Sequence, residues 1–155
     1  MSTVMLFLGL CLTPNVLSMG ALMSLSDEKE GVMYTNVHVL RVLDGDTVVI
    51  SAPYLLPPLK PELAVRIYGV DTPEKGSRAK CAAERRRGEA ATRFTEGWLA
   101  AVSSPGLVLL GWDKYGGRVL GDFWLPNQTS LRQSLLTRGL ARAYFGETKT
   151  SWCGR

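Results

Sequence analysis

The segment that most restricts the fold is residues 35–51, which are rich in Val, Thr and Ile and are split by Asp44-Gly45. An Asp-Gly pair between two β-branched runs predicts a tight hairpin. Prolines between positions 53 and 61 then indicate a stiff loop, and residues 63–70 form another extended apolar run. The first half of the chain is therefore predicted to be a β-meander.

A long helix is predicted after the meander, over residues 80–102. Its expected apolar stripe recurs mostly at three- to four-residue spacing. The stripe consists of Ala83, Ala90, Phe94, Trp98 and Ala101. Pro105-Gly106 ends this helical segment.

The remaining segments return to extended structure and then to a second helix. Residues 107–112 and 119–125 predict two strands joined by a polar turn. Ser130 with Gln133 is a capping box for a short helix, Gly139 is the residue that should end it, and 140–145 predict a last strand. The order meander, helix, hairpin, helix predicts an α+β domain: a small closed or half-closed barrel with helices beside it.

Size and composition narrow the class of protein. A length of 155 residues suits one domain, and the net charge of +4 is compatible with a polyanionic partner without proving one. The single histidine, His38, and the three cysteines have no zinc-site spacing. Any bound metal should therefore have oxygen ligands, which favours calcium or magnesium.

The N-terminal segment has the features of a leader. Residues 1–26 carry no charged side chain, and 4–12 form an apolar run too short to span a bilayer. This pattern predicts a signal-like or disordered leader over 1–30 and a folded domain over 31–155. The alternative is a start codon placed too early, with Met23 or Met33 as the true start. The protein is expected to be secreted or periplasmic if the leader is a signal peptide, and cytoplasmic otherwise.

Three polar segments interrupt the strands. They are Asp44-Gly45-Asp46-Thr47, the run Arg66 to Glu74 that contains Asp71-Thr72-Pro73-Glu74, and Asp113-Lys114-Tyr115-Gly116-Gly117-Arg118. Each alone has an ordinary structural explanation as a hairpin turn or a capped helical turn.

Arg66 and Asp71 are not explained by turn chemistry. They are five residues apart, so they would face opposite sides of a regular strand. For both to reach one site, the chain must bend near Gly69 or leave the sheet at Asp71.

Taken together, the three segments and Leu136-Thr137-Arg138-Gly139-Leu140-Ala141 resemble the staphylococcal nuclease family over about residues 37–145. The resemblance implies a five-stranded oligonucleotide-binding type of β-barrel with two or three flanking helices. It also implies a Ca²⁺-dependent nuclease that hydrolyses phosphodiester bonds in DNA, RNA or both.

The resemblance assigns a role to each polar residue. Ca²⁺ would be bound by Asp46, Asp71 and the carbonyl of Thr72, with Asp44 farther out. Glu74 would be the general base. The remaining residues would contact the substrate: Arg66 and Arg118 at the scissile phosphate, and Lys114 and Tyr115 elsewhere on the nucleic acid.

One departure from the family pattern concerns the second arginine. The commonest form places arginine directly after Tyr-Gly, whereas here Gly117 stands between Gly116 and Arg118. Either the turn is one residue longer and Arg118 still points inward, or its role is weakened.

The residue types suit phosphodiester hydrolysis. The transition state gains charge on the phosphate oxygens, which a hard divalent cation and two bidentate guanidinium groups stabilise. A positioned carboxylate can take a proton from the attacking water. Two further carboxylates are needed to hold the cation.

Two alternative functions remain open. The first is a catalytically inactive module of the same fold that binds nucleic acid or protein; the second is a β-barrel that binds a small ligand or peptide. A basic run within residues 75–93 either guides nucleic acid or is a solvated helix face. Nothing in the sequence indicates an oligomer, so a monomer is expected.

Cys81 and Cys153 pose a further alternative. If the leader is removed, Cys11 leaves with it, and the even count in an exported protein favours a disulfide between the two remaining cysteines. The other possibility is two unpaired thiols in a cytosolic enzyme.

Overall fold

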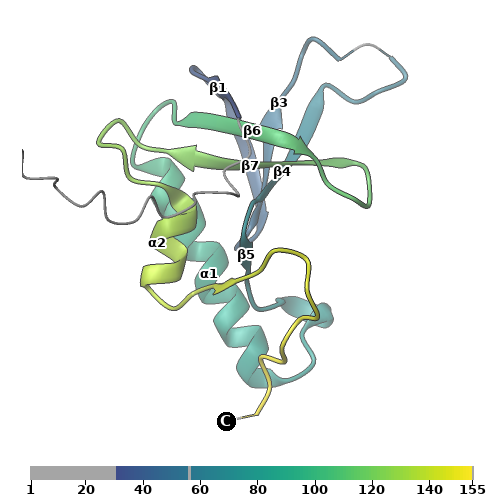
Figure 1. Ribbon diagram of the computed structural model, residues 1–155, viewed down its shortest axis with the longest axis vertical. Helices are drawn as coiled ribbons and strands as arrows, with labels where there is room; N and C mark the ends of the chain where they lie inside the picture. The colour runs from purple at the N-terminus through teal and green to yellow at the C-terminus, as the bar shows by residue number, and fades with distance from the viewer. Residues whose placement is uncertain (1–30, 56, 155) are drawn as a thin grey trace, which may run out of the picture.

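A computed structural model describes residues 31–55 and 57–154, which form two sheets and two α-helices (Figure 1). The leader expected over 1–30, its cleavage and Cys11 lie outside the described residues.

The larger sheet has six strands in the order β1-β6-β7-β4-β3-β2. Their bounds are β1 Val32–Tyr34, β2 Val39–Asp44, β3 Thr47–Ser51, β4 Glu62–Ile67, β6 Gly106–Trp112 and β7 Arg118–Trp124. β2, β3 and β4 form the predicted antiparallel meander. Asp44 on β2 pairs with Thr47 on β3, and Thr47 pairs in turn with Arg66 on β4.

The predicted α+β class is confirmed, but the sheet is not closed as a five-stranded barrel. Closure would require the outer strand β2 to pair with the far edge of β6. That edge pairs instead with β1, in a register that sets Val32 opposite Leu109. β1 is a sixth strand that the sequence did not reveal, because three residues are too few to show an alternating pattern.

The helix α1, Ala82–Ala100, links the two halves of the sheet. It belongs to the connection between β4 and β7, which pair in parallel, and a parallel pair needs such a long crossover. Figure 1 shows α1 running beneath the sheet with α2, Leu131–Thr137, packed beside it. Neither helix in the described part of the chain is both long enough and apolar enough to cross a bilayer.

The predicted stripe of α1 is only partly correct, because Phe94 and Trp98 pack against the core and the three alanines of the stripe do not. None of its five members is fully buried. The buried face is centred instead on Gly88, Ala91, Thr95 and Leu99. Polar Thr95 is buried because its hydroxyl donates to the carbonyl of Gly45 at 2.7 Å, a contact across 50 residues.

α2 begins and ends as predicted. The Ser130 hydroxyl accepts a hydrogen bond from the backbone N–H of Gln133 at 3.0 Å, which is the N-cap contact. The reciprocal half of the capping box does not form, since the Gln133 amide donates to Thr137. Gly139 has φ 65°, the left-handed conformation of a residue that ends a helix.

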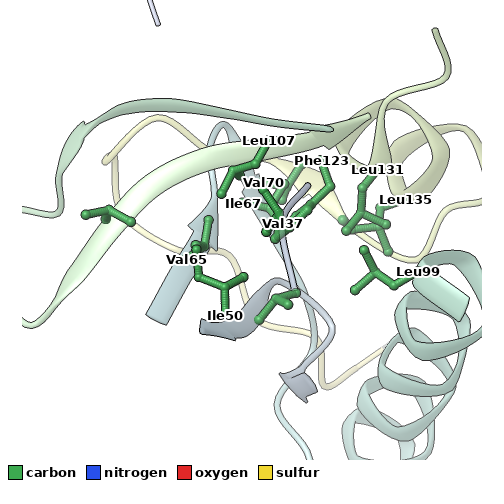
Figure 2. Close-up of a cluster of buried hydrophobic side chains, with 13 residues drawn as sticks. Val37, Ile50, Val65, Ile67, Val70, Leu99, Leu107, Phe123, Leu131 and Leu135 are labelled. Atoms are coloured by element: carbon green, nitrogen blue, oxygen red, sulfur yellow. The ribbon is translucent and has the colours of Figure 1, made fainter. Parts of the chain in front are cut away.

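The hydrophobic core lies between the sheet and the two helices (Figure 2). Phe123 on β7 and Ile67 on β4 are almost completely buried, and they meet Leu131 and Leu135 from α2 and Leu99 from α1. This packing fixes β4 and β7 relative to the helices, and the site described below is built on the ends of these strands.

A second, two-stranded sheet follows the meander. β5, Val70–Asp71, pairs antiparallel with β8, Arg142–Ala143, which is shorter than the predicted strand over 140–145. After β8 the chain runs without helix or strand to the start of α1, where Cys153 is joined to Cys81 in a disulfide. Residues 144–154 are called the C-terminal tail below; most of the segment is yellow in Figure 1.

Candidate active site

A cleft of about 680 Å³ opens beside the ends of β4 and β7. Its walls come from the β2–β3 turn, the segment after β4, the β6–β7 turn and the C-terminal tail. Eight residues of the predicted site line it: Asp44, Asp46, Arg66, Thr72, Glu74, Lys114, Tyr115 and Arg118. Predicted Asp71 is buried just behind the wall, where it contacts Lys149, a residue that does line the cleft.

The bend inferred between Arg66 and Asp71 is present. β4 ends at Ile67, Gly69 adopts φ 75°, and Asp71 belongs to the second sheet. The left-handed conformation at Gly69 is open to glycine at little cost. As a result, the Arg66 guanidinium lies 2.9 Å from Asp46 Oδ1 and 3.9 Å from Asp71 Oδ1, so both carboxylates lie around one cation.

Asp46 is held from two sides. Oδ1 accepts hydrogen bonds from Arg66 Nη1 at 2.9 Å and from the Thr47 hydroxyl at 3.2 Å. Oδ2 accepts from the backbone N–H of Thr72 at 3.2 Å, which draws the segment after β5 against the β2–β3 turn. Each carboxylate oxygen has two lone pairs, so these contacts leave acceptor capacity for a cation.

Burial dominates the titration of Asp46. It raises the pKa of the Asp46 carboxyl to about 7; the Arg66 guanidinium opposes the rise, and the neighbouring Asp44 carboxyl adds to it. Because burial disfavours the charged form of Asp46, any cation that enters the cleft would stabilise its carboxylate.

Asp71 carries a buried oxygen without a hydrogen-bond donor. Its Oδ2 accepts from the indole N–H of Trp152 at 3.1 Å. Lys149 Nζ lies 2.5 Å from Oδ1 as an ion pair, but without hydrogen-bond geometry, so Oδ1 remains unsatisfied. The cationic partner of this oxygen in the described structure is therefore the Lys149 ammonium, which a metal ion at Oδ1 would have to displace.

The donor set fits a hard cation. Asp46, Asp71 and the backbone oxygen of Thr72 offer only oxygen, which Ca²⁺ and Mg²⁺ prefer. Among the described residues, the one compact group of at least three histidine, cysteine or acidic side chains is Cys81, Glu84 and Cys153. Two of its members are joined in the disulfide, so that group is not a calcium site.

Glu74 stands at the mouth of the cleft, and Arg78 orients it. Arg78 Nε donates to Glu74 Oε2 at 3.0 Å, and Arg78 Nη2 donates to Asp44 Oδ2 at 3.2 Å. The Glu74 side chain is 39% exposed, so water reaches it. Sequence reasoning placed Arg78 only in the basic run and missed this bridging position.

Arg118 points to the same face of the sheet as Arg66. Arg118 pairs with Ala64 in the parallel β4–β7 ladder, and Arg66 is two residues beyond Ala64, so side-chain alternation sends both arginines to one side. Strand spacing places their Cα atoms roughly 8 Å apart. The two side chains therefore start from neighbouring positions on one face of the sheet and both line the cleft.

The additional glycine is absorbed by the turn. Gly116 and Gly117 adopt φ 69° and 70°, and the backbone N–H of Asp113 donates to the carbonyl of Arg118 at 3.0 Å, which closes the loop. Arg118 therefore still lines the cleft. Its Nη2 and Nε atoms donate to Asp113 Oδ2 at 2.6 and 3.0 Å, which holds the side chain across the start of the turn.

The β6–β7 turn also carries exposed aromatic groups. Tyr115 is 77% exposed, and the Lys114 ammonium lies 5.0 Å from its ring centroid. Trp112, 70% exposed, lines the same cleft and was not predicted as a site residue. Exposed rings beside basic side chains can stack on nucleic-acid bases.

Lys149 and Trp152 are further site residues that sequence reasoning missed. The nearest available signal was the cysteine pair: a disulfide at Cys153 would bring the tail to the start of α1, close in sequence to Asp71 and Glu74. No local motif marks either residue.

The sheet is an open α+β sheet of oligonucleotide-binding type, with a cleft of carboxylate and arginine side chains at the ends of its strands. The family model described as "Staphylococcal nuclease homologue" matches residues 64–152, more than half of the chain. The chain therefore belongs to the staphylococcal nuclease family. The match includes Arg66, Asp71, Glu74 and Arg118 but begins after Asp46. No curated protein matches the chain.

Proposed function

We propose that this protein is a Ca²⁺-dependent nuclease that hydrolyses phosphodiester bonds in DNA, RNA or both. The observation that carries the proposal is the pair of arginines, Arg66 and Arg118, on one face of adjacent strands beside two buried aspartates. Family membership supports a nuclease type of chemistry.

The cation would be held by Asp46, Asp71 and the Thr72 carbonyl. When bound, it would supply positive charge to a phosphate oxygen and to the attacking water. The chain's own donors would orient these ligands, because the Thr72 N–H and Arg66 hold Asp46 while the Trp152 N–H holds Asp71. Binding would also require Lys149 to move away from Asp71 Oδ1.

Glu74 is assigned as the general base. Its partly exposed carboxylate can accept a proton from a water at the mouth of the cleft, a step typically worth about 10²–10⁴-fold. Arg78 holds the Glu74 carboxylate through Oε2, and Oε1 is the oxygen proposed to accept the proton.

Arg66 and Arg118 are assigned to the phosphate. Arg66 uses Nη1 and Nη2 for Asp46 and the Val70 carbonyl, and a guanidinium has five donors, so donors remain for a phosphate oxygen. Charge that develops on the phosphate oxygens is then met by fixed cations in a partly buried setting.

The deciding experiment is cleavage of single-stranded DNA, double-stranded DNA and RNA by the purified protein, with Ca²⁺ or with excess EGTA. We expect cleavage only with Ca²⁺, and a loss of at least about 10²-fold in Glu74→Gln, which preserves shape but cannot accept the proton. Binding of nucleic acid without cleavage by the unaltered protein would instead favour the inactive binding module. Full cleavage in EGTA would contradict the metal assignment.

A further inference from the structure

The C-terminal tail places an indole against the proposed calcium ligand. Trp152 Nε1 donates to Asp71 Oδ2 at 3.1 Å, although the two residues are 81 positions apart, and both side chains are buried. A carboxylate with one oxygen fixed by a donor can rotate little. The other oxygen, Oδ1, forms an ion pair with Lys149 and lies 3.9 Å from Arg66.

Trp152 is itself held by three contacts. The Arg142 guanidinium stacks on its ring at 3.7 Å from the centroid, and Arg87 Nη1 donates to its backbone carbonyl at 3.2 Å. The next residue, Cys153, is covalently tied to Cys81 at the N-cap of α1.

Most other contacts of the tail are made by side chains: Arg142 donates to Thr150 and to the Ser151 carbonyl, and Lys149 pairs with Asp71. Within the described residues 145–154 there is no helix or strand, and none makes a backbone–backbone hydrogen bond. The local contacts there involve side chains, such as the pair of Ser151 and Cys153. The disulfide at Cys153 is therefore a covalent restraint next to the Trp152 indole, in addition to the contacts of Trp152 with Arg142, Arg87 and Asp71.

We propose that Trp152, tethered by the Cys81–Cys153 disulfide, is a positioning residue that orients Asp71 for Ca²⁺ and makes calcium affinity depend on the redox state of that disulfide. The inference rests on the proposed function, because it assigns Asp71 to the cation. Trp152 touches neither substrate nor cation; it acts through Asp71. Donors that orient a metal ligand in this way typically change metal affinity by about 10–100-fold when they are lost.

The opposite oxygen of Asp71 offers a contrast. The Lys149 ammonium lies 2.5 Å from Oδ1, and its side chain is 47% exposed. A positive charge on the oxygen that would face the cation competes with it. Loss of the Lys149 ammonium should therefore leave calcium affinity unchanged or raise it. If substitutions in the tail acted only by loosening it, loss of Lys149 and loss of Trp152 would both lower calcium affinity.

The test is direct titration of the full-length oxidised protein with Ca²⁺ by isothermal calorimetry. Trp152→Phe keeps an aromatic ring to stack on Arg142 but removes the N–H, and the Kd of this variant for Ca²⁺ should rise by about 10–100-fold.

The matched control is Trp98→Phe, which removes an indole hydrogen bond to Ser134 in the interface between α1 and α2, and the Kd of this variant for Ca²⁺ should not change. Cys81→Ser with Cys153→Ser should weaken binding in the same direction as Trp152→Phe, and Lys149→Gln should not weaken it.

A second readout separates positioning from a merely structural role. Turnover of Trp152→Phe should return to within about threefold of the unaltered protein at saturating Ca²⁺, because every ligand remains. An unchanged Kd for Trp152→Phe, with or without a lower melting temperature, would overturn the inference and leave the proposed function intact. Absence of calcium binding in the unaltered protein would overturn both. Tight binding without cleavage would overturn only the nuclease assignment.

Discussion

Asp46 sits at the centre of the candidate site with almost no access to water. It is 3% exposed, and its carboxylate touches a guanidinium, a hydroxyl and a backbone N–H. Its charge is thus balanced by one cation and two dipoles in a buried setting. Burial outweighs these favourable contacts and raises the pKa of the Asp46 carboxyl to about 7 in the metal-free protein.

This raised pKa predicts a pH-dependent stability. The folded pKa exceeds the unfolded value of 3.8, so the contribution of Asp46 is fully present below about pH 4 and is lost as pH rises through about 7. In EGTA, the free energy of unfolding should therefore fall by about 2–3 kcal/mol more between pH 5 and 8 in the unaltered protein than in Asp46→Asn. Urea unfolding at both pH values measures the difference. Equal pH dependence in the two proteins would show that Asp46 titrates normally.

The two arginines can be compared in the same way. Arg66→Ala should lower turnover by roughly 10²–10³-fold, the scale of one lost donor to a charged transition state. Because Gly117 is accommodated in the turn and Arg118 lines the cleft, Arg118→Ala should cost a similar factor. Steady-state cleavage at saturating Ca²⁺ measures both. A loss below about threefold for Arg118→Ala alone would show that Asp113 keeps this guanidinium away from the phosphate.

At the scale of elements, α1 acts as the surface against which the site segments are laid. The Gly45 carbonyl bonds to Thr95, and a Cβ at Gly88 would lie 2.5 Å from the Glu74 carbonyl oxygen. The β2–β3 turn and the Glu74 segment therefore both rest on the same face of one helix. Their relative position follows from how closely the backbone can approach it.

The two glycines within α1 provide a test of this packing. Gly97→Ala meets no atom within 4 Å and should stabilise the protein by about 0.5–1 kcal/mol, the ordinary gain in a helix. Gly88→Ala has the same intrinsic gain but meets the backbone of Pro73 and Glu74, so it should destabilise by about 1–3 kcal/mol and lower cleavage by displacing Glu74. Urea unfolding and activity assays report the two effects. Similar stability of the two variants would mean that the segment around Glu74 yields easily.

Elements defined by local patterns were predictable from the sequence, and those defined by distant contacts were not. The Asp44-Gly45 hairpin, the extent of α1 and the N-cap of α2 depend on neighbours in the chain. The buried face of α1 was mispredicted because Thr95 and Gly88 are buried by a backbone carbonyl and a backbone approach, and not by hydrophobicity. β1 was missed because its three residues are too few to show an alternating pattern, and its partner, β6, is remote in the sequence.

The same division applies to the candidate site. Of the residues that line the cleft, those in the three polar segments were predicted through motifs, and the bend at Gly69 was inferred from the spacing of Arg66 and Asp71. The indole on Asp71 and the ammonium beside it come from a tail without a motif. Only the tertiary fold brings these side chains to a residue that the sequence had already singled out.

At the scale of the whole molecule, the site connects both ends of the described chain to its middle. Asp46 belongs to the first hairpin, Asp71 to the second sheet, and Trp152 to the C-terminal tail, while the disulfide joins that tail to α1. A cation that binds Asp46 and Asp71 together would therefore cross-link segments that separate on unfolding. Binding of the cation should therefore raise the free energy of unfolding of the whole domain.

Calcium should accordingly raise the free energy of unfolding by about 2.7 kcal/mol at a free concentration 100 times its Kd, since only the folded chain brings the ligands together. Asp71→Asn should lose most of this increment, because one of its carboxylate oxygens is replaced by an amide. The matched control is Asp122→Asn: Asp122 is also buried, but it bonds to Ser130 and the backbone of Arg132 at the start of α2, so the variant should keep the full increment whatever its own baseline stability. Urea unfolding with Ca²⁺ and with EGTA gives the increment for each protein. An equal increment in Asp71→Asn and Asp122→Asn would place the cation elsewhere, and a zero increment in the unaltered protein would remove the calcium site altogether.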